Sequence, residues 1–184
     1  VIGTMGQVSS SIYLVETESD LNNLPFNHDQ EIAYVTQTTL SIDDTQSIIK
    51  AIKKKYQKVI EPRKDDICYA TTNRQDAVKK IATKCDIFIV IGAKNSSNSL
   101  RLVEVAKQYG AKKSILLENI EKFDHSLLKN ANNVGLTASA SAPEILVQNF
   151  IQILKNNYAI VVNELNYNYE DISFKIPQQL KNKI

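Results

Sequence analysis

The sequence is poor in the residues that build disulfide frameworks and metal sites: it has two cysteines and two histidines among 184 residues. Two thiols, Cys68 and Cys85, cannot form a disulfide framework, and in an α/β chain of this size they are better interpreted as reduced. The sequence therefore points to a reducing compartment. It shows neither a signal peptide nor an apolar run approaching the ~20 residues that span a bilayer, so no membrane segment is predicted.

Glycine and an excess of either charge are also lacking. Only five glycines occur, and neither a phosphate-loop Gly-Lys-Ser/Thr pattern nor the glycine fingerprint of dinucleotide-binding folds is present, which argues against nucleotide chemistry. The 22 basic and 20 acidic residues leave a net charge of +2, so we expect little attraction to nucleic acid or to a membrane surface. The lysine cluster at 50–58 is interpreted as a solvated helix face.

What the sequence does contain is an alternation of short β-branched runs with amphipathic helical stretches. The predicted strands are 12–15, 31–35, 58–60, 66–69, 86–91, 114–117 and 133–136. The predicted helices are 43–56, 73–83, 99–109, 123–130 and 142–155. This alternation predicts an α/β fold of parallel sheets covered by helices. We expect two small parallel-sheet α/β lobes, 1–64 and 65–154, and a C-terminal tail, 155–184, that packs back on them.

Hydroxyl and amide side chains crowd the junctions where predicted strands lead into helices. These junctions are 36–41, 70–75, 92–99 and 137–144. In a parallel sheet they gather at the carboxyl edge, where open α/β folds bind ligands, and each ends at a helix N-terminus that attracts anions. Capping boxes, at Thr72 with Gln75 and at Ser141 with Glu144, would explain one residue per junction. They do not explain the run at 95–98, which favours a phosphate or diphosphate ligand.

Cys68 stands beside one of these junctions, next to a predicted helix start that would favour its thiolate. Such a thiolate is either a nucleophile or a metal ligand. Neither His28 nor His125 neighbours a junction, and this scarcity of bases favours the metal ligand. One thiol cannot hold a metal by itself, however, and Cys85 enters an apolar strand, where we interpret it as a buried core residue.

Five separated motifs then occur in order along the chain. They are Gly-Thr-Met-Gly-Gln at 3–7, Thr-Gln-Thr-Thr-Leu-Ser at 36–41, Lys-Asp-Asp-Ile-Cys-Tyr-Ala-Thr-Thr-Asn-Arg-Gln at 64–75, Lys-Asn-Ser-Ser-Asn-Ser at 94–99 and Ala-Ser-Ala-Pro at 140–143. Together they resemble the (E)-4-hydroxy-3-methylbut-2-enyl diphosphate reductase family of the non-mevalonate isoprenoid pathway, over residues 1 to about 155. The resemblance implies an oxidoreductase of three α/β lobes around a four-iron four-sulphur cluster, with one cysteine from each lobe.

The resemblance also implies roles for residues of this chain. It makes Cys68 a cluster ligand and Thr38 a proton relay. The residues that it assigns to binding of the substrate diphosphate are Thr38, Ser96, Ser97, Asn98 and Ser141. Position 139 is serine where the family usually has glycine, a change expected to stiffen the loop before Ser141.

The family's other two cysteines, its histidines and its proton-donating glutamate would precede Val1. The chain opens without an initiator methionine, as though cut from something longer. We therefore expect it to be an incomplete part of the enzyme, lacking the first lobe and inactive alone.

The implied reaction is a two-electron reductive dehydroxylation that gives isopentenyl and dimethylallyl diphosphates. Ferredoxin or flavodoxin is the implied electron donor, and bacterial cytoplasm or a plastid-type organelle the implied compartment. Two alternatives remain open. One is a sugar-phosphate-binding regulatory or isomerase module, which needs no cysteine, and the other is a hydrolase or transferase that uses Cys68 as its nucleophile.

Overall fold

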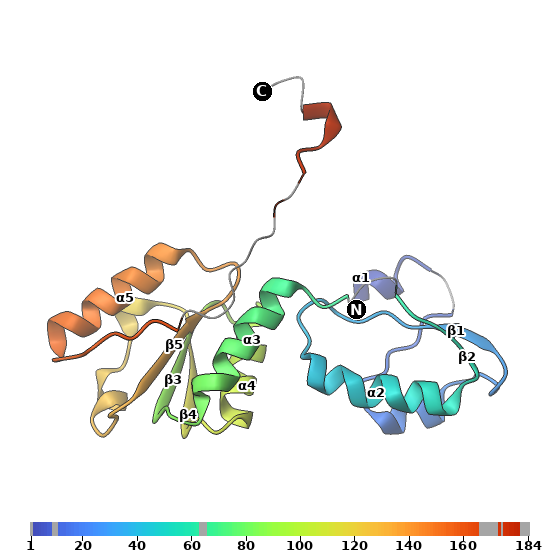
Figure 1. Ribbon diagram of the computed structural model, residues 1–184, viewed down its shortest axis with the longest axis horizontal. Coiled ribbons are helices and arrows are strands. Elements are labelled where there is room, and N and C mark those ends of the chain that lie inside the picture. The colour runs from blue at the N-terminus through green and yellow to red at the C-terminus, as the bar shows by residue number, and fades with distance from the viewer. Residues whose placement is uncertain (1, 9–10, 63–65, 166–172, 174, 181–184) are drawn as a thin grey trace.

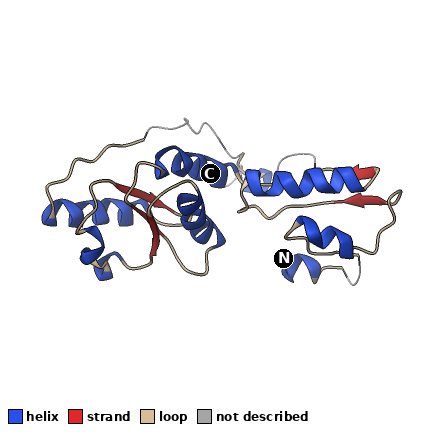
Figure 2. Ribbon diagram, turned by 90° about the horizontal axis from the view of Figure 1, so that it is seen from below, coloured by secondary structure: helices blue, strands red, loops and turns tan. Residues whose placement is uncertain are grey.

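The chain folds into two lobes that lie side by side along its long axis (Figure 1; Figure 2). The computed structural model describes residues 2–8, 11–62, 66–165, 173 and 175–180. One lobe carries a two-stranded sheet and the other a three-stranded sheet, and all pairings are parallel. The predicted α/β fold of small parallel sheets is confirmed. The predicted lobe boundary at residue 64 falls outside the described residues.

The first lobe is a short parallel sheet crossed by one long helix. Strands β1 (Glu31–Ala33) and β2 (Lys58–Ile60) pair in parallel and are joined through α2 (Ile42–Lys55). The helix has two aspartates in its first turn and three lysines in its last, so its charges complement the helix dipole. The short α1 (Ile2–Met5) precedes this unit.

The core of the first lobe is small. It consists of Leu21 from the 3-10 helix η1 (Glu18–Asn23), Ile52 from α2, and Tyr56 just after α2. The Lys55 ammonium donates to the Leu21 carbonyl and so ties the end of α2 to η1. Burial is shallow, because the strands have only three residues each and expose alternate positions.

The second lobe is a three-layer sandwich around the strand order β4-β3-β5. The strands are β3 (Ile87–Ile91), β4 (Lys113–Leu117) and β5 (Val134–Ala138). The helices are α3 (Tyr69–Ala82), α4 (Ser97–Gln108) and α5 (Glu144–Asn157). Figure 1 shows α3 and α4 on one face of the sheet and α5 on the other.

The central strand β3 explains why this lobe forms. All five of its residues are buried, as expected for a parallel strand covered on both faces. Because side chains alternate across a strand, Ile87, Ile89 and Ile91 join the cluster under α5, while Phe88 and Val90 join the cluster under α3 and α4. One apolar run thus supplies two cores.

Two predicted strands are wrong. The segment 66–69 forms a bend, and α3 begins at Tyr69, four residues earlier than predicted. The segment 12–15 has no ladder partner in the described part of the chain, and without one a β-branched run is not a strand. The predicted helix 123–130 is also wrong in extent: within it the structure has only the 3-10 turn His125–Leu128, whose N-cap is Asp124.

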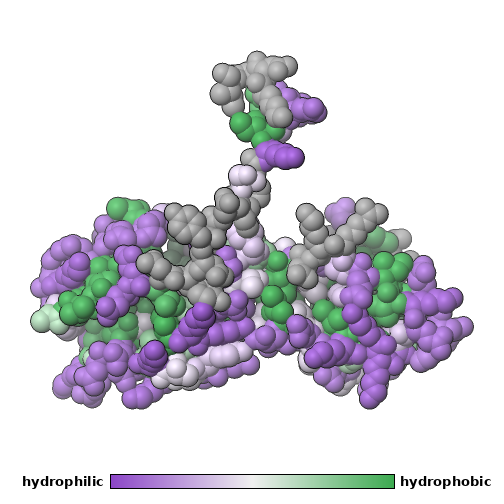
Figure 3. Space-filling view, viewed as in Figure 1, coloured by the Kyte–Doolittle hydropathy of each residue, from purple (hydrophilic) through white to green (hydrophobic). Residues whose placement is uncertain are grey.

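The described part of the tail contains little regular structure. Residues 159–164 lack helix and strand, and the 3-10 helix η4 (Gln178–Leu180) is exposed and drawn apart from both lobes in Figure 1. Packing of the tail on the lobes stays a prediction. Figure 3 shows a largely hydrophilic face with hydrophobic patches on each lobe. Among the described helices, none has the length and apolarity needed to cross a bilayer.

Candidate functional site

The junction between the lobes brings Thr38 and Cys68 together. The backbone N–H of Cys68 donates to the carbonyl of Thr38 at 3.0 Å. A second bond runs the other way, since the N–H of Thr36 donates to the Asp66 carboxylate at 2.8 Å. Two segments about thirty residues apart in sequence are therefore fixed against each other by these hydrogen bonds, and both carry predicted site residues.

Cys68 is the N-cap of α3, so it lies even closer to a helix start than the sequence predicted. Its carbonyl accepts from the N–H groups of Thr71 and Thr72 at 2.9 and 3.0 Å. The predicted capping box of Thr72 with Gln75 is wrong, because both residues lie inside the helix. Gln75 is 2% exposed and instead donates from Nε2 to the Leu40 carbonyl at 3.4 Å, a third bond between the lobes.

A cavity of about 570 Å³ opens at this junction. Its lining residues are Thr38, Ile42, Asp66, Ile67, Cys68, Tyr69, Thr72 and Asn73. The Cys68 thiol is free and exposed, and no group of three His, Cys, Asp or Glu side chains in the described segments could hold a metal ion. The described residues therefore form no complete metal site around Cys68.

Cys85 has a different environment. It is 6% exposed within the core under α3 and α4, and its Sγ donates to the Ile81 carbonyl at 3.2 Å. Burial, with a smaller contribution from Asp86, raises the pKa of the Cys85 thiol. The interpretation of Cys85 as a core residue is confirmed.

A second group of site residues lies at the carboxyl edge of the three-stranded sheet. Ser96 is the N-cap of α4, and its Oγ accepts from the N–H of Ser99 at 3.3 Å. The loop after β5 packs beside this turn, because a Cβ built on Gly92 would lie 2.2 Å from Ser99 Oγ and 3.1 Å from Ser139 Cβ. The first turn of α4 and the loop that carries Ser141 thus meet over Gly92.

Asn98 and Ser99 add buried polar groups to this edge. Asn98 is 6% exposed, and neither its amide nitrogen nor its amide oxygen has a hydrogen-bond partner among the described residues. The Ser99 Oγ, in a residue that is 0% exposed, is also without one. An unsatisfied buried polar group costs about 1–3 kcal/mol. Such groups beside a helix N-terminus are suited to a ligand that completes their hydrogen bonds.

Ser141 is exposed at the same edge, and the predicted capping box with Glu144 is wrong. Pro143 is the N-cap of α5, and the Glu144 carboxylate accepts from Gln148 instead. The Ser141 hydroxyl lies 3.1 Å from the hydroxyl of Ser139, which leaves it at the surface rather than within the helix cap.

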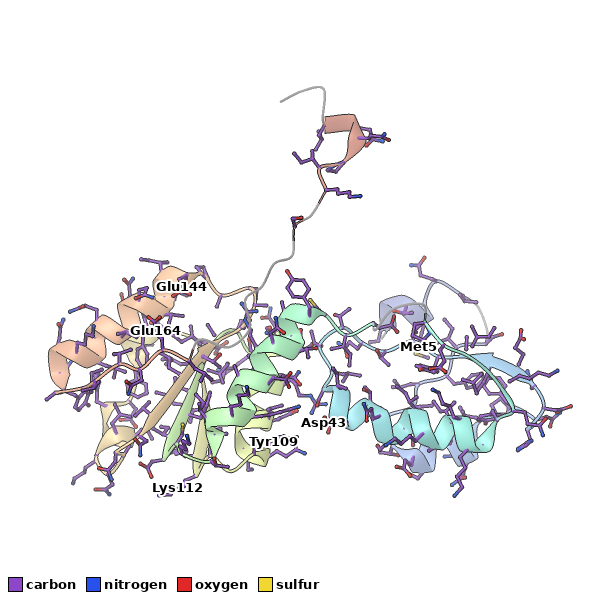
Figure 4. All side chains as sticks on the ribbon, viewed as in Figure 1. Met5, Asp43, Tyr109, Lys112, Glu144 and Glu164 are labelled. Carbon is purple, nitrogen blue, oxygen red and sulfur yellow. The ribbon has the colours of Figure 1, made fainter. Side chains whose placement is uncertain are left out.

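Charged side chains join the lobes on a further side. The Asp43 carboxylate, at the start of α2, accepts from the Lys79 ammonium at 2.6 Å and from the Tyr109 hydroxyl at 2.7 Å. These two hydrogen bonds lower the pKa of Asp43. Arg101 pairs with Asp44 at 2.8 Å beside them. Figure 4 shows Asp43 and Tyr109 facing each other across the gap between the ribbons of the two lobes.

Neither histidine contributes to the two groups. His28 and His125 are both exposed, and His125 Nδ1 lies 2.9 Å from the Tyr158 hydroxyl. Sequence reasoning missed Asp66 and Gln75 as inter-lobe contacts. Both residues belong to the motif around Cys68, but no rule of residue spacing predicts that they form hydrogen bonds with the segment 36–40. The described contacts join Thr38 to Cys68, and Ser141 to the α4 turn, but not one group to the other.

Comparisons with known proteins agree with this architecture. The family model described as LytB protein matches residues 1–155. A 4-hydroxy-3-methylbut-2-enyl diphosphate reductase from Acinetobacter baylyi is 47% identical over 185 aligned residues, which cover 98% of this chain and 58% of the relative. The protein of the same name from Nitrosomonas europaea is 45% identical, with 97% of this chain and 58% of the relative covered.

A solved structure carries the same likeness. The E-1-hydroxy-2-methyl-but-2-enyl-4-diphosphate reductase from Plasmodium falciparum matches with a TM-score of 0.85 and 36% identity, over 99% of this chain and 57% of that one. The chain thus spans a little under three fifths of its relatives' length. Because the family match covers most of the sequence and the structural match extends over both lobes, the chain belongs to the LytB protein family.

Proposed function

We propose that the full-length protein is a 4-hydroxy-3-methylbut-2-enyl diphosphate reductase and that this chain supplies part of its site. The observation that carries the proposal is the backbone hydrogen bond from the Cys68 N–H to the Thr38 carbonyl, which fixes Cys68, with its exposed thiol, beside Thr38 in the lining of the inter-lobe cavity. A surface cysteine without a role in binding would not need its backbone to be fixed in this way. In a LytB family chain, a thiol held rigidly at a helix start fits a cluster ligand.

The proposed cofactor is a four-iron four-sulphur cluster with Cys68 as one of its ligands. Further cysteines would come from the part of the relatives that this chain does not cover. When bound, the cluster would pass to the substrate the two electrons, taken from an external donor, that loss of the hydroxyl as water requires. Two protons are consumed as well, and we propose Thr38 as a relay for one, because a hydroxyl both donates and accepts.

The proposed diphosphate site is the carboxyl edge of the second lobe, formed by Ser96, Ser97, Asn98 and Ser141. It offers the N-terminus of α4, exposed hydroxyls and the unpartnered amide of Asn98. Phosphate oxygens accept hydrogen bonds and carry negative charge, so they match both the donors and the helix dipole.

The partners follow from this reaction. We propose ferredoxin or flavodoxin as electron donor, and a reducing compartment, either bacterial cytoplasm or a plastid-type organelle. The 184-residue chain alone should be colourless and inactive. A purified chain that is brown and reduces the substrate would contradict the proposal that other ligands are needed.

The decisive experiment substitutes each cysteine in the full-length protein, purified without oxygen. Cys68→Ser should lose bound iron and reduction of (E)-4-hydroxy-3-methylbut-2-enyl diphosphate. Cys85→Ser is the matched control and should retain both, because Cys85 lies in the core. Unchanged activity and ligand binding in Cys68→Ser would favour a sugar-phosphate-binding module. Alkylation of Cys68 in a colourless, active protein would favour a cysteine-nucleophile hydrolase or transferase.

A further inference from the structure

Ser139 is a buried serine directly beneath the proposed diphosphate ligand Ser141. It is 2% exposed, and its backbone is fixed at both ends. Its N–H donates to the Ile91 carbonyl at 2.9 Å, and its carbonyl accepts from the N–H of Ala142 at 2.9 Å. Because the residue is held this firmly and hidden from solvent, its hydroxyl cannot swing out to contact a ligand itself.

Among the described residues, the Ser139 hydroxyl nevertheless has two hydrogen-bond contacts, and both are with Ser141. The two Oγ atoms lie 3.1 Å apart, and the N–H of Ser141 points at Ser139 Oγ over 3.4 Å. Ser141, by contrast, is exposed. The pair therefore joins one hydroxyl that faces the protein with one that faces the proposed anion.

The direction of the hydrogen bond between the two hydroxyls follows from proton counting. A hydroxyl carries one proton and two lone pairs. Ser139 Oγ already accepts from the N–H of Ser141, so its own proton is free to be donated to Ser141 Oγ. A phosphoryl oxygen has no proton to donate, so Ser141 must donate to it. Only when Ser139 donates to Ser141 is the single Ser141 proton left for the anion.

We infer that Ser139 is a positioning residue that commits the Ser141 hydroxyl proton to a phosphoryl oxygen of the substrate diphosphate. The inference rests on the proposed diphosphate site. Ser139 acts only through Ser141, in the order Ser139 Oγ–H to Ser141 Oγ, then Ser141 Oγ–H to phosphate. The amide of Asn98 at the same sheet edge is 6% exposed and has no hydrogen-bond partner within the described segments, which independently indicates a polar ligand there.

The test is a double-mutant cycle in the full-length protein, with inorganic diphosphate as the probe and its affinity measured by calorimetry. A hydrogen bond to a charged group is worth about a 10- to 100-fold change in affinity, which is the loss expected for Ser141→Ala. Ser139→Ala should weaken binding about 3- to 10-fold, and Ser139→Gly similarly. The double variant should bind no worse than Ser141→Ala alone, because Ser139 has no other route to the ligand.

The control is Ser114→Ala, which removes another buried hydroxyl from the same lobe, one without a hydrogen-bond partner among the described residues. It should leave the affinity unchanged. If Ser139→Ala binds as wild type, or weakens binding equally when Ser141 is already alanine, the inference is overturned and Ser139 is merely structural. If wild type fails to bind diphosphate, or Ser141→Ala has no effect, the proposed diphosphate site itself fails.

Discussion

Gly92 is the position where a single methyl group would disturb the proposed diphosphate site most directly. It directly follows β3, and the first turn of α4 and the loop after β5 close over it. A Cβ at this position would lie 2.2 Å from the Oγ and 2.9 Å from the Cβ of Ser99, and 3.1 Å from the Cβ of Ser139. Neither serine can retreat, because their exposed fractions are 0% and 2%.

The magnitude follows from these overlaps. Carbon atoms in contact prefer separations of about 3.5–4.0 Å, so the new methyl group would overlap Ser99 by roughly 1 Å. Overpacking of a tight interior costs about 1–3 kcal/mol. For a chain of this length each kcal/mol lowers the melting temperature by about 2–4 °C, so Gly92→Ala should melt about 4–8 °C below wild type for a cost of about 2 kcal/mol. The displaced α4 turn should also weaken diphosphate binding.

Thermal unfolding followed by circular dichroism measures the first effect. The matched control is Gly3→Ala, where the added Cβ meets nothing within 4 Å and should leave the melting temperature unchanged or slightly raised. A second substitution, Ser99→Gly, removes the closest atoms and should restore part of the loss in the double variant. The described packing would be refuted if Gly92→Ala had the melting temperature of wild type. It would also be refuted if adding Ser99→Gly did not raise the melting temperature of Gly92→Ala.

Three further predictions concern the frame around the site. Gly135→Ala should lower the unfolding free energy by about 1–3 kcal/mol in urea titration, because its Cβ would lie 2.5 Å from the ring of fully buried Phe88; wild-type stability would contradict this. The Lys112 ammonium and two backbone N–H groups lower the pKa of Asp86 from 3.8 to about 2. This lowered pKa adds stability above about pH 4, so the melting difference between wild type and Asp86→Asn should shrink as the pH falls from about 4 to 2; a difference independent of pH would refute that role. Gln75→Leu should destabilise the chain by about 1–2 kcal/mol, measured by urea titration, since it leaves a carbonyl between the lobes unpaired; no loss would show that the bond contributes nothing.

Most of the second lobe could be predicted from sequence, because its strands are long enough for their hydrophobic pattern to indicate which of their faces are buried. The run 87–91 is wholly apolar, which marks a parallel strand covered on both faces, and the predicted bounds differ from β3 by a single residue. In such segments local pattern and tertiary burial agree, so periodicity is a sufficient guide.

In the segment 66–69 the local sequence pattern and the tertiary structure disagree. Its β-branched and aromatic residues favour a strand, yet its polar groups are satisfied across the lobe boundary. Asp66 accepts from the backbone of Thr36, and the N–H of Cys68 donates to Thr38. With those bonds made to another lobe, no ladder is needed, and the chain turns directly into α3. Such long-range partners leave no periodic mark on the sequence.

The same distinction between local pattern and long-range contacts applies to the residues of the candidate site. Serine, threonine and asparagine residues at helix starts could be identified from sequence as candidate anion ligands, because few side chains suit an anion at a helix N-terminus. The residues with which these side chains form hydrogen bonds could not be predicted from sequence. Ser139 was expected only to stiffen a loop, whereas in the described part of the chain its hydroxyl forms its hydrogen-bond contacts with Ser141. A sequence shows that two hydroxyls stand two residues apart, but the direction of the proton between them depends on which one the fold buries, and that is set by the packing of Ser139 against β3.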